Sequence, residues 1–295
     1  MTATPTHTTI LDLAPETLAL AFEFVEVGDT AFFIGTDLHS LKHASLVCRN
    51  WRDLAQRQLC RHQFLWGPLG SRRAVKYLES DVSGRYPVEH LEVLGIPVPM
   101  NVLELCWGLR ALTLEGIKAL DADFFHHPHL ANLKRLSLGG VRMLPSTTLA
   151  STPTSIQLNY LSTDLLSMPE ALSGLFESSS TSLKTLRLYL SSRRDTQHLL
   201  DVFPFIASSL TRLDFHAHLP SEDFHSLLST CTSLTAMGFK AAEAYKPLIL
   251  LAEHLPPSVR RLTFNREAPS YAPRFILSLF SLKVQRVFCR LISRP

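Results

Sequence analysis

The sequence predicts an α/β protein in which short parallel strands alternate with helices in a stacked solenoid that follows a small N-terminal helical segment. Three observations lead to this prediction. One apolar motif recurs along most of the chain, helix-like stretches separate its copies, and the first 66 residues lack it. A single strand–helix unit cannot cover its own apolar face, so neighbouring units must stack against one another.

The recurring motif is Leu109-x-x-Leu112-x-Leu114. Clear copies begin at Leu133, Leu183, Leu210, Leu234 and Val259, and weaker ones begin at Leu91 and Val284. Near Ile156 two registers are possible, one with Ser155, Leu158 and Tyr160 and the other with Ile156, Asn159 and Leu161. Most single-unit spacings fall in the range of leucine-rich repeats. The last two apolar positions of each copy stand two apart, which suits a strand that turns both side chains toward a core.

The repeats are predicted to be irregular. A regular leucine-rich repeat places Asn or Cys three residues after the last apolar position, where the side chain bonds the turn backbone. In this chain those positions hold Ile117, Val141, Ser191, His218, Ala242 and Glu267. The helix-like stretches between the copies are residues 164–178, 194–207, 221–229 and 246–255. At the C-terminus, residues 275–282 are expected to form a helix and residues 285–290 a final strand.

Composition limits the possible functions. Apolar residues make up 46% of the chain and charged residues 19%, which indicates a large buried core and argues against disorder. The net charge of +3 is too small to imply nucleic acid or an anionic membrane as partner. Five scattered cysteines argue against a disulfide framework and indicate a reducing compartment. We therefore expect a soluble protein of the cytoplasm or the nucleus, or of both.

Motifs that carry chemistry are missing from the sequence. It contains no glycine-rich phosphate loop, no His-Glu-x-x-His and no Gly-x-Ser-x-Gly. The cluster His126-His127-Pro128-His129 lacks spaced cysteine or carboxylate partners, so a solvated loop is a better interpretation than a metal site. We expect no catalytic residue, no metal and no cofactor, and hence a protein that is not an enzyme.

The N-terminal segment has a helical apolar pattern. On a helix, Leu41, Ala44, Val47, Cys48, Trp51, Leu54 and Ala55 share one broad stripe. Leu46 falls on the opposite side, among charged and polar residues, which is out of place for a simple two-sided helix. Pro15 and Glu16 suit the first turn of an earlier helix, because proline has the right φ and an acid is favourable at the positive end of the helix dipole.

These segments carry a family resemblance. The elements are Leu13-Ala14-Pro15-Glu16-x-Leu18, then Asp37-Leu38, then Ser45-Leu46-Val47-Cys48-Arg49-Asn50-Trp51-Arg52-Asp53-Leu54-Ala55, and a trailing Leu65-Trp66. Together they resemble the F-box, a three-helix adaptor motif, in its fungal-type form. An F-box followed by irregular leucine-rich repeats resembles the F-box/leucine-rich-repeat substrate receptors of cullin ubiquitin ligases.

The resemblance implies a division of the chain and a mechanism. It implies an F-box over residues 10–66 that docks on a Skp-type adaptor of a cullin complex, a connecting helical linker over residues 67–87, and a solenoid over residues 88–295 that binds a target protein. The adaptor-binding candidates are Leu13, Pro15, Glu16, Leu18 and Leu46, and the core candidates of the motif are Val47, Cys48 and Trp51. In the alternative, the F-box-like helices only cap the open apolar end of a non-catalytic interaction scaffold.

The residues that alternate with the inward apolar pairs are expected to form a concave target-binding face. Seven Lys or Arg against two acids fall at these positions, although the whole chain has 29 against 26. The target-binding candidates are Arg135, Arg187, Tyr189, Arg212, His216, Lys240 and Arg261. Because arginine grips carboxylate or phosphate bidentately, the expected ligand is an acidic or phosphorylated segment of a target protein. In the alternative, these charges only keep a solvated strand face soluble.

Overall fold

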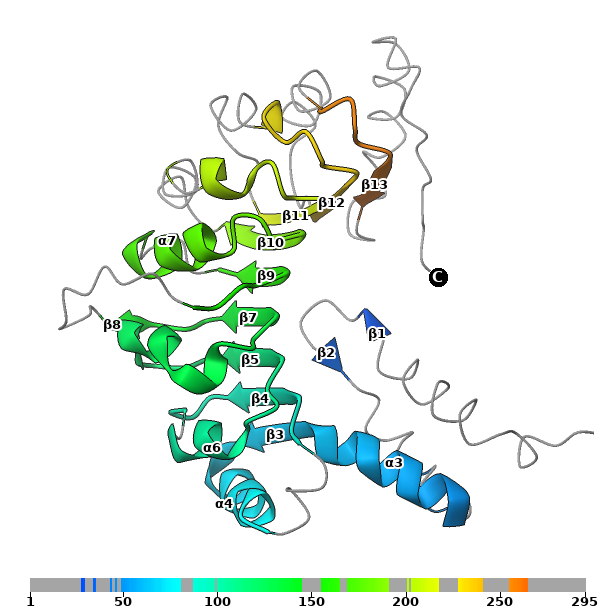
Figure 1. The fold of residues 1–295 in the computed structure, drawn as a ribbon, viewed down its shortest axis with the longest axis vertical. Helices are drawn as coiled ribbons and strands as arrows, with labels where there is room; N and C mark the ends of the chain where they lie inside the picture. The colour runs from blue at the N-terminus through cyan, green and yellow to red at the C-terminus, as the bar shows by residue number, and fades with distance from the viewer. Residues whose placement is uncertain are drawn as a thin grey trace, which may run out of the picture.

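The chain builds a nine-stranded, all-parallel sheet in which every strand pairs with the next one along the solenoid (Figure 1). The strands are β3 (His62–Trp66), β4 (His90–Leu94), β5 (Ala111–Glu115), β7 (Arg135–Gly139), β9 (Tyr160–Thr163), β10 (Thr185–Leu190), β11 (Arg212–Ala217), β12 (Ala236–Lys240) and β13 (Arg261–Phe264). This computed structural model describes residues 28–29, 34–35, 43, 46, 49–80, 87–98, 100–144, 155–164, 169–190, 201, 203–217, 228–240 and 255–264.

The remaining helices and short strands either precede the first strand of the sheet or lie in the connections between its strands. The helices are α3 (Arg49–Arg61), α4 (Gly67–Leu78), α6 (Met100–Leu105) and α7 (Pro169–Ser178), with 3-10 helices η2 (Ala122–His126) and η3 (Pro128–Leu130). The pair β6 (Leu120–Asp121) and β8 (Met143–Leu144) is parallel, whereas β1 (Gly28–Asp29) and β2 (Ile34–Gly35) are antiparallel. In Figure 1 α3 runs outward from the start of β3, away from the stack of strands. No helix among the described residues is long and apolar enough to cross a membrane.

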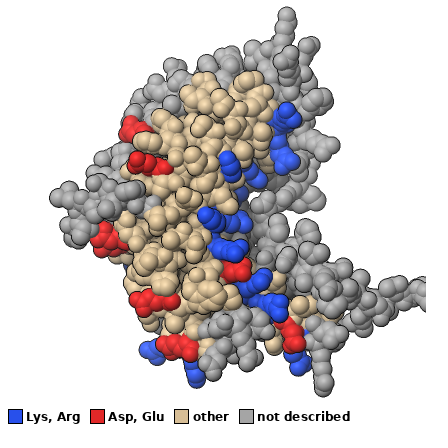
Figure 2. Space-filling model, viewed as in Figure 1, with Lys and Arg blue, Asp and Glu red and all other residues tan. Residues whose placement is uncertain are grey.

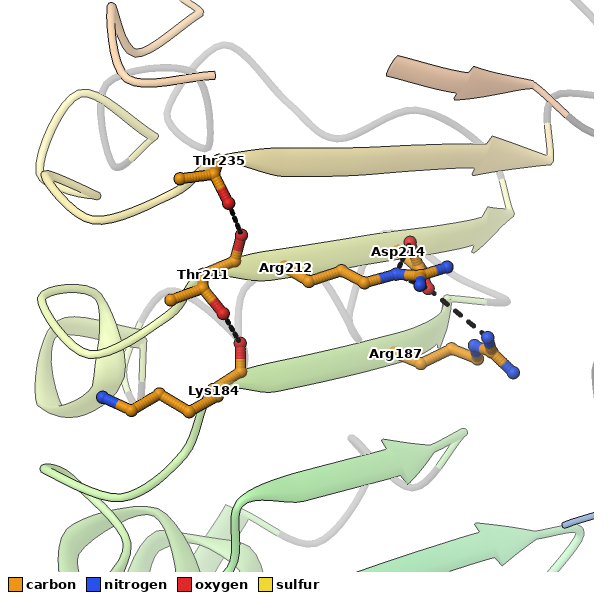
Figure 3. Close-up of polar contacts among 6 residues, drawn as sticks. All are labelled: Lys184, Arg187, Thr211, Arg212, Asp214 and Thr235. Atoms are coloured by element: carbon orange, nitrogen blue, oxygen red, sulfur yellow. Dashed lines mark hydrogen bonds and ion pairs between the residues drawn. The ribbon is translucent and has the colours of Figure 1, made fainter. Parts of the chain in front are cut away.

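One backbone carbonyl per repeat fixes the register of each strand on the preceding one. The carbonyl of Lys134, the residue before β7, accepts the N–H groups of Asn159 at 2.8 Å and Tyr160 at 3.1 Å in the next repeat. The same two-donor arrangement recurs at the carbonyls of Glu89, Arg110, Asn159, Lys184, Thr211 and Thr235. Hydroxyl groups reinforce it, because Thr211 Oγ1 donates to the Lys184 carbonyl at 3.0 Å and Thr235 Oγ1 donates to the Thr211 carbonyl at 3.1 Å (Figure 3). We call this series the carbonyl ladder.

The predicted stacking of strand–helix units is confirmed, but two copies of the motif were predicted in the wrong register. Pairing of β9 with β7 aligns Leu161 with Leu136 and Thr163 with Leu138, so neither register proposed near Ile156 is right. A buried threonine stands there in place of a leucine, which conceals the copy in the sequence. Similarly, pairing of β4 with β5 shows that the copy predicted to begin at Leu91 begins three residues earlier, at Val88.

The solenoid also begins earlier than predicted. β3 pairs in parallel with β4, and Leu65 is fully buried in the same core as Val93. The predicted start at residue 88 is therefore too late, and the predicted linker 67–87 contains α4, which connects two strands of one sheet. Leu65-Trp66 belongs to this first strand. The motif is hard to recognise in β3 because one of its two inward positions holds the polar Gln63, whereas the other holds Leu65. The predicted C-terminal helix and strand lie outside the described residues.

Left-handed glycines close the strands at the other end. Gly95, Gly116 and Gly140 follow β4, β5 and β7 with φ of 65°, 64° and 57°. The Gly116 N–H donates to the Gly139 carbonyl at 2.7 Å, and the Gly140 N–H donates to Asp164 Oδ2 at 2.7 Å. These turns therefore bond between repeats without the asparagine that a regular leucine-rich repeat uses.

The glycine turns make a stability prediction. Gly116→Ala should lower the free energy of unfolding by about 1–2 kcal/mol, because a Cβ is disfavoured at positive φ even though it meets only ordinary contacts there. Gly174→Ala in α7 is the matched control and should raise stability by up to about 1 kcal/mol, since that Cβ would meet nothing within 4 Å. Urea unfolding measures both, and equal effects of the two substitutions would contradict the role given to Gly116.

Candidate functional site

The open face of the sheet is formed by the first residue of each strand and every second residue after it, which alternate with the inward-facing, mostly apolar residues. The register places all seven predicted target-binding residues at these positions. His216 and Lys240 are placed there by their backbone positions alone. The structure thus gathers onto one face residues that are spread over more than 120 positions of sequence. That they bind a target stays a prediction.

A buried carboxylate organises the middle of the open face. Asp214 Oδ2 lies 3.4 Å from Arg187 Nη2 and 3.0 Å from Arg212 Nε, and Oδ1 lies 3.2 Å from Arg212 Nε (Figure 3). The side chains of Asp214 and Arg187 are only 6% and 12% exposed. The next strand leaves room for this carboxylate because residue 238 is glycine, and a Cβ there would collide with Asp214 Oδ1.

This ion-pair cluster corrects the charge count made from the sequence. Arg187 and Arg212 were predicted to offer free positive charge to a target, but both are already paired with Asp214. The pairing follows from register: Asp214 stands directly beside Arg187 on the adjacent strand and two residues beyond Arg212 on its own strand. Much of the positive charge at this point of the face is therefore neutralised within the protein.

Aromatic side chains fill the space around the cluster. The Arg135 guanidinium lies over the Tyr160 ring, 5.0 Å from its centroid, which is a cation–π contact. Burial raises the pKa of Tyr189, although hydrogen bonds with Arg187 and Ser162 oppose that shift. Tyr189 therefore stays a neutral phenol at physiological pH, and the central part of the face consists of ordered, mutually bonded side chains.

The β3–β5 end of the face differs from the rest. The ring centroids of His62 on β3 and His90 on β4 lie 4.1 Å apart, and at the other end of β3 Trp66 is 72% exposed. Burial, with help from the positive charges of His62 and nearby arginines, lowers the pKa of His90 to about 3. Burial and the neighbouring carboxylate of Glu115 raise the pKa of Glu92 to about 7.

Sequence reasoning missed these residues because it shifted one strand and overlooked another. With the copy wrongly started at Leu91, His90 fell outside the strand and Glu92 was not assigned to the face. The signal that could have found them is the alternation His-Leu-Glu-Val over residues 90–93, in which polar and apolar residues take turns as in a half-buried strand.

The predicted adaptor-binding residues are only partly within the described structure. Leu46 has helical backbone and is 70% exposed, as its place on the polar side of the helix suggested. Trp51, a predicted core residue of the motif, is partly buried at the start of α3. The other candidates, Leu13, Pro15, Glu16, Leu18, Val47 and Cys48, lie outside the described residues.

Two of the described cysteines, Cys106 and Cys231, are buried free thiols. Burial raises the pKa of the Cys106 and Cys231 thiols to about 12, so both stay protonated and are poor nucleophiles. The rings of His127 and His129 lie 5.4 Å apart in the 3-10 helical region. Within the described residues, no group of three or more His, Cys, Asp or Glu side chains could hold a metal ion.

Comparison with known proteins adds little to this geometry. No protein-family model and no curated protein matches the chain. A solved structure similar to it is the leucine-rich repeat domain of the type III effector XopL, with 13% sequence identity, 94% of this chain and 95% of that chain covered, and a TM-score of 0.30. A score that low carries no argument. The register on its own defines the described sheet as part of an α/β solenoid, and most of its repeat lengths fall in the range of leucine-rich repeats.

The tight fit of Asp214 over Gly238 makes a coupling prediction. Gly238→Ala should destabilise the protein by roughly 1–3 kcal/mol, because the new methyl group displaces the carboxylate. In an Asp214→Ala background, which itself removes the carboxylate that pairs with Arg187 and Arg212 and costs roughly 1.5–3 kcal/mol, the same change should cost much less. A double-mutant cycle from urea unfolding measures the difference. Strictly additive effects would mean that the two residues do not share this space.

Glu92 makes a pH prediction. Its folded pKa of about 7 lies above the ordinary value of 4.5, so folding favours the protonated form. Its contribution to stability is therefore complete below about pH 4.5 and is lost as the pH rises through 7. Glu92→Gln should make the protein more stable than the parent at pH 8 and change little at pH 4.5, as measured by thermal unfolding. The exposed Glu104→Gln is the control, and a gain of the same size from both variants would contradict this assignment.

Proposed function

We propose that this chain is a substrate-recognition subunit of an SCF-type ubiquitin ligase. Its F-box-like segment docks on a Skp-type adaptor of the cullin complex, and the open face of the solenoid binds a target protein. The chain supplies no chemistry and needs no cofactor. It acts by holding the target at high effective concentration near a conjugating enzyme that carries ubiquitin, and it works in the cytoplasm, the nucleus or both.

The observation that carries the proposal is the exposure of Leu46. A leucine that presents 70% of its surface to solvent lies within the segment whose sequence resembles the F-box, three residues before α3 begins. Exposed apolar side chains are common singly, but one beside a matching interaction motif suits a docking surface. The arrangement of the chain supports the same division of labour, because α3 leads away from the stack and the open face lies on the strands.

One observation favours the alternative, a non-catalytic interaction scaffold whose N-terminal helices cap the solenoid. Ala55 and Gln58 of α3 are buried, and α3 runs without a break into β3, the first strand of the sheet. A helix fused to the end of a solenoid in this way could serve as a cap. Binding to the adaptor separates the two functions, since a cap needs no adaptor.

Replacing the exposed leucine tests the proposal. Leu46→Asp should reduce co-purification of the full chain with a Skp-type adaptor by on the order of tenfold or more, because a charge would enter an apolar interface. It should leave the melting temperature unchanged, since the side chain is already solvated. Leu144→Asp on β8, where the leucine is 41% exposed, is the matched control and should retain the adaptor. Undiminished adaptor binding by Leu46→Asp, or no binding by the parent chain, would refute the ligase function.

A further inference from the structure

Positive charge gathers where the strands begin. We define the basic ridge as the residue before each strand together with the first residue of that strand, from β5 to β13. The register aligns these fourteen positions, which include no acid. Seven are cationic: Arg110, Lys134, Arg135, Lys184, Arg212, Arg260 and Arg261. Since the whole chain has 29 basic and 26 acidic residues, composition does not explain this concentration.

The picture of the surface agrees with the register. Figure 2 shows Lys and Arg following one another in a column along the stack, whereas most Asp and Glu on that view lie at the opposite margin. Sequence reasoning found only Arg135, Arg212 and Arg261 of this set. It overlooked the residues before the strands, because only the carbonyl ladder shows that these residues also stand in line.

The ridge is poorly neutralised by the protein itself. In the part of the chain that the structure describes, Arg212 is the ridge residue with an ion pair, to Asp214. Arg110, Lys134, Arg260 and Arg261 are exposed and make no ion pair with any described residue. The potential reaches neighbouring groups, because Arg135 and Arg110 add to the effect of burial in lowering the pKa of His90. Like charges held in a row repel one another, and a bound polyanion relieves that repulsion.

The shape of the ridge limits what can bind to it. Strands lie about 4.8 Å apart, so the six steps from β5 to β13 span about 29 Å, the length of about nine residues of extended polypeptide. The cations are distributed over five of the seven strands, which suits several separate carboxylates better than one phosphate group. The backbone here is already bonded within the carbonyl ladder, so a ligand must be recognised through side chains.

We propose that the basic ridge binds an extended acidic segment of the target protein, a role that rests on the proposed function as a substrate receptor. Single-stranded nucleic acid is less suited, because it is usually held by aromatic side chains that stack on the bases. Tyr160 is the aromatic residue among the fourteen ridge positions, and Arg135 already covers one face of its ring. The small net charge of +3 also argues against nucleic acid.

Charge reversal on the full chain tests this binding surface. The ridge variant combines Arg110→Glu, Lys134→Glu and Arg260→Glu. The control variant combines Lys76→Glu, Lys118→Glu and Arg142→Glu, which changes the net charge equally at exposed positions outside the ridge. The probe is a fluorescein-labelled peptide of about ten residues in which Glu and Ser alternate, and fluorescence anisotropy measures its affinity at low and high salt.

The ridge variant should lose on the order of tenfold or more in affinity at low salt and show a weaker salt dependence, whereas the control variant should lose less than about threefold. The corresponding Arg→Gln and Lys→Gln triple variant should lose less than the Glu variant and keeps the test valid if charge reversal impairs folding. Equal losses in ridge and control variants, no binding of the peptide to the parent chain, or tighter ridge-dependent binding of an oligothymidine of equal charge would each overturn the proposal.

The experiment is independent of the adaptor. Peptide binding that depends on the ridge, in a chain that does not co-purify with a Skp-type adaptor, would leave the acidic-segment proposal standing and remove the ligase function. Adaptor binding without ridge-dependent peptide binding would leave the ligase function standing and remove the acidic-segment proposal.

Discussion

The carbonyl ladder is the interaction on which the rest of the structure depends. Each carbonyl of the ladder accepts two N–H groups of the following repeat, so from β4 to β13 every unit is placed on the last by atoms that all residue types share. Serine side chains complete the pattern: the buried Ser209 donates from Oγ to the Leu183 carbonyl and the half-buried Ser182 from Oγ to the Leu158 carbonyl, both at 2.8 Å. Buried carbonyls that lacked such partners would each cost free energy comparable to a lost hydrogen bond.

Because the ladder fixes the register, it also decides which side chains become neighbours across strands. The Asp214 cluster exists because residues 27 positions apart are set side by side, and the closeness of Glu92 to Glu115 has the same origin. In both places charge is held partly away from water. At Asp214 two arginines compensate for the lost hydration, whereas at Glu92 the proton does so. The open face therefore changes character along its length, from histidine, carboxylate and exposed tryptophan at one end to arginine and tyrosine further on.

The sequence was sufficient to predict most of the strands, because Leu, Ile, Val or Phe occupies both inward positions in β5, β7, β10, β11 and β13. It was insufficient where an inward position is polar, as at Gln63 and Thr163. It also failed at β4, where Leu94 and Ile96 fit the motif as well as the actual inward pair, Leu91 and Val93. In the described strands whose register was predicted correctly, the alternation of residues also indicated which side chains lie on the open face. The alignment of the motif copies already set Arg187 beside Asp214, but a count of charges along the face does not show that these two side chains neutralise each other.

Because the carbonyl ladder is made of backbone atoms, a residue of the ladder can stabilise the fold through its main chain while its side chain is free to serve in recognition. Lys134 and Arg260 hold the solenoid together through main-chain atoms, while their side chains extend freely into solvent. Exposed side chains can thus be substituted in one repeat at a time without disturbing the core. Duplication of a repeat would lengthen the row of charges by one step. An architecture of this kind can acquire new recognition specificities by drift and duplication at little cost to folding.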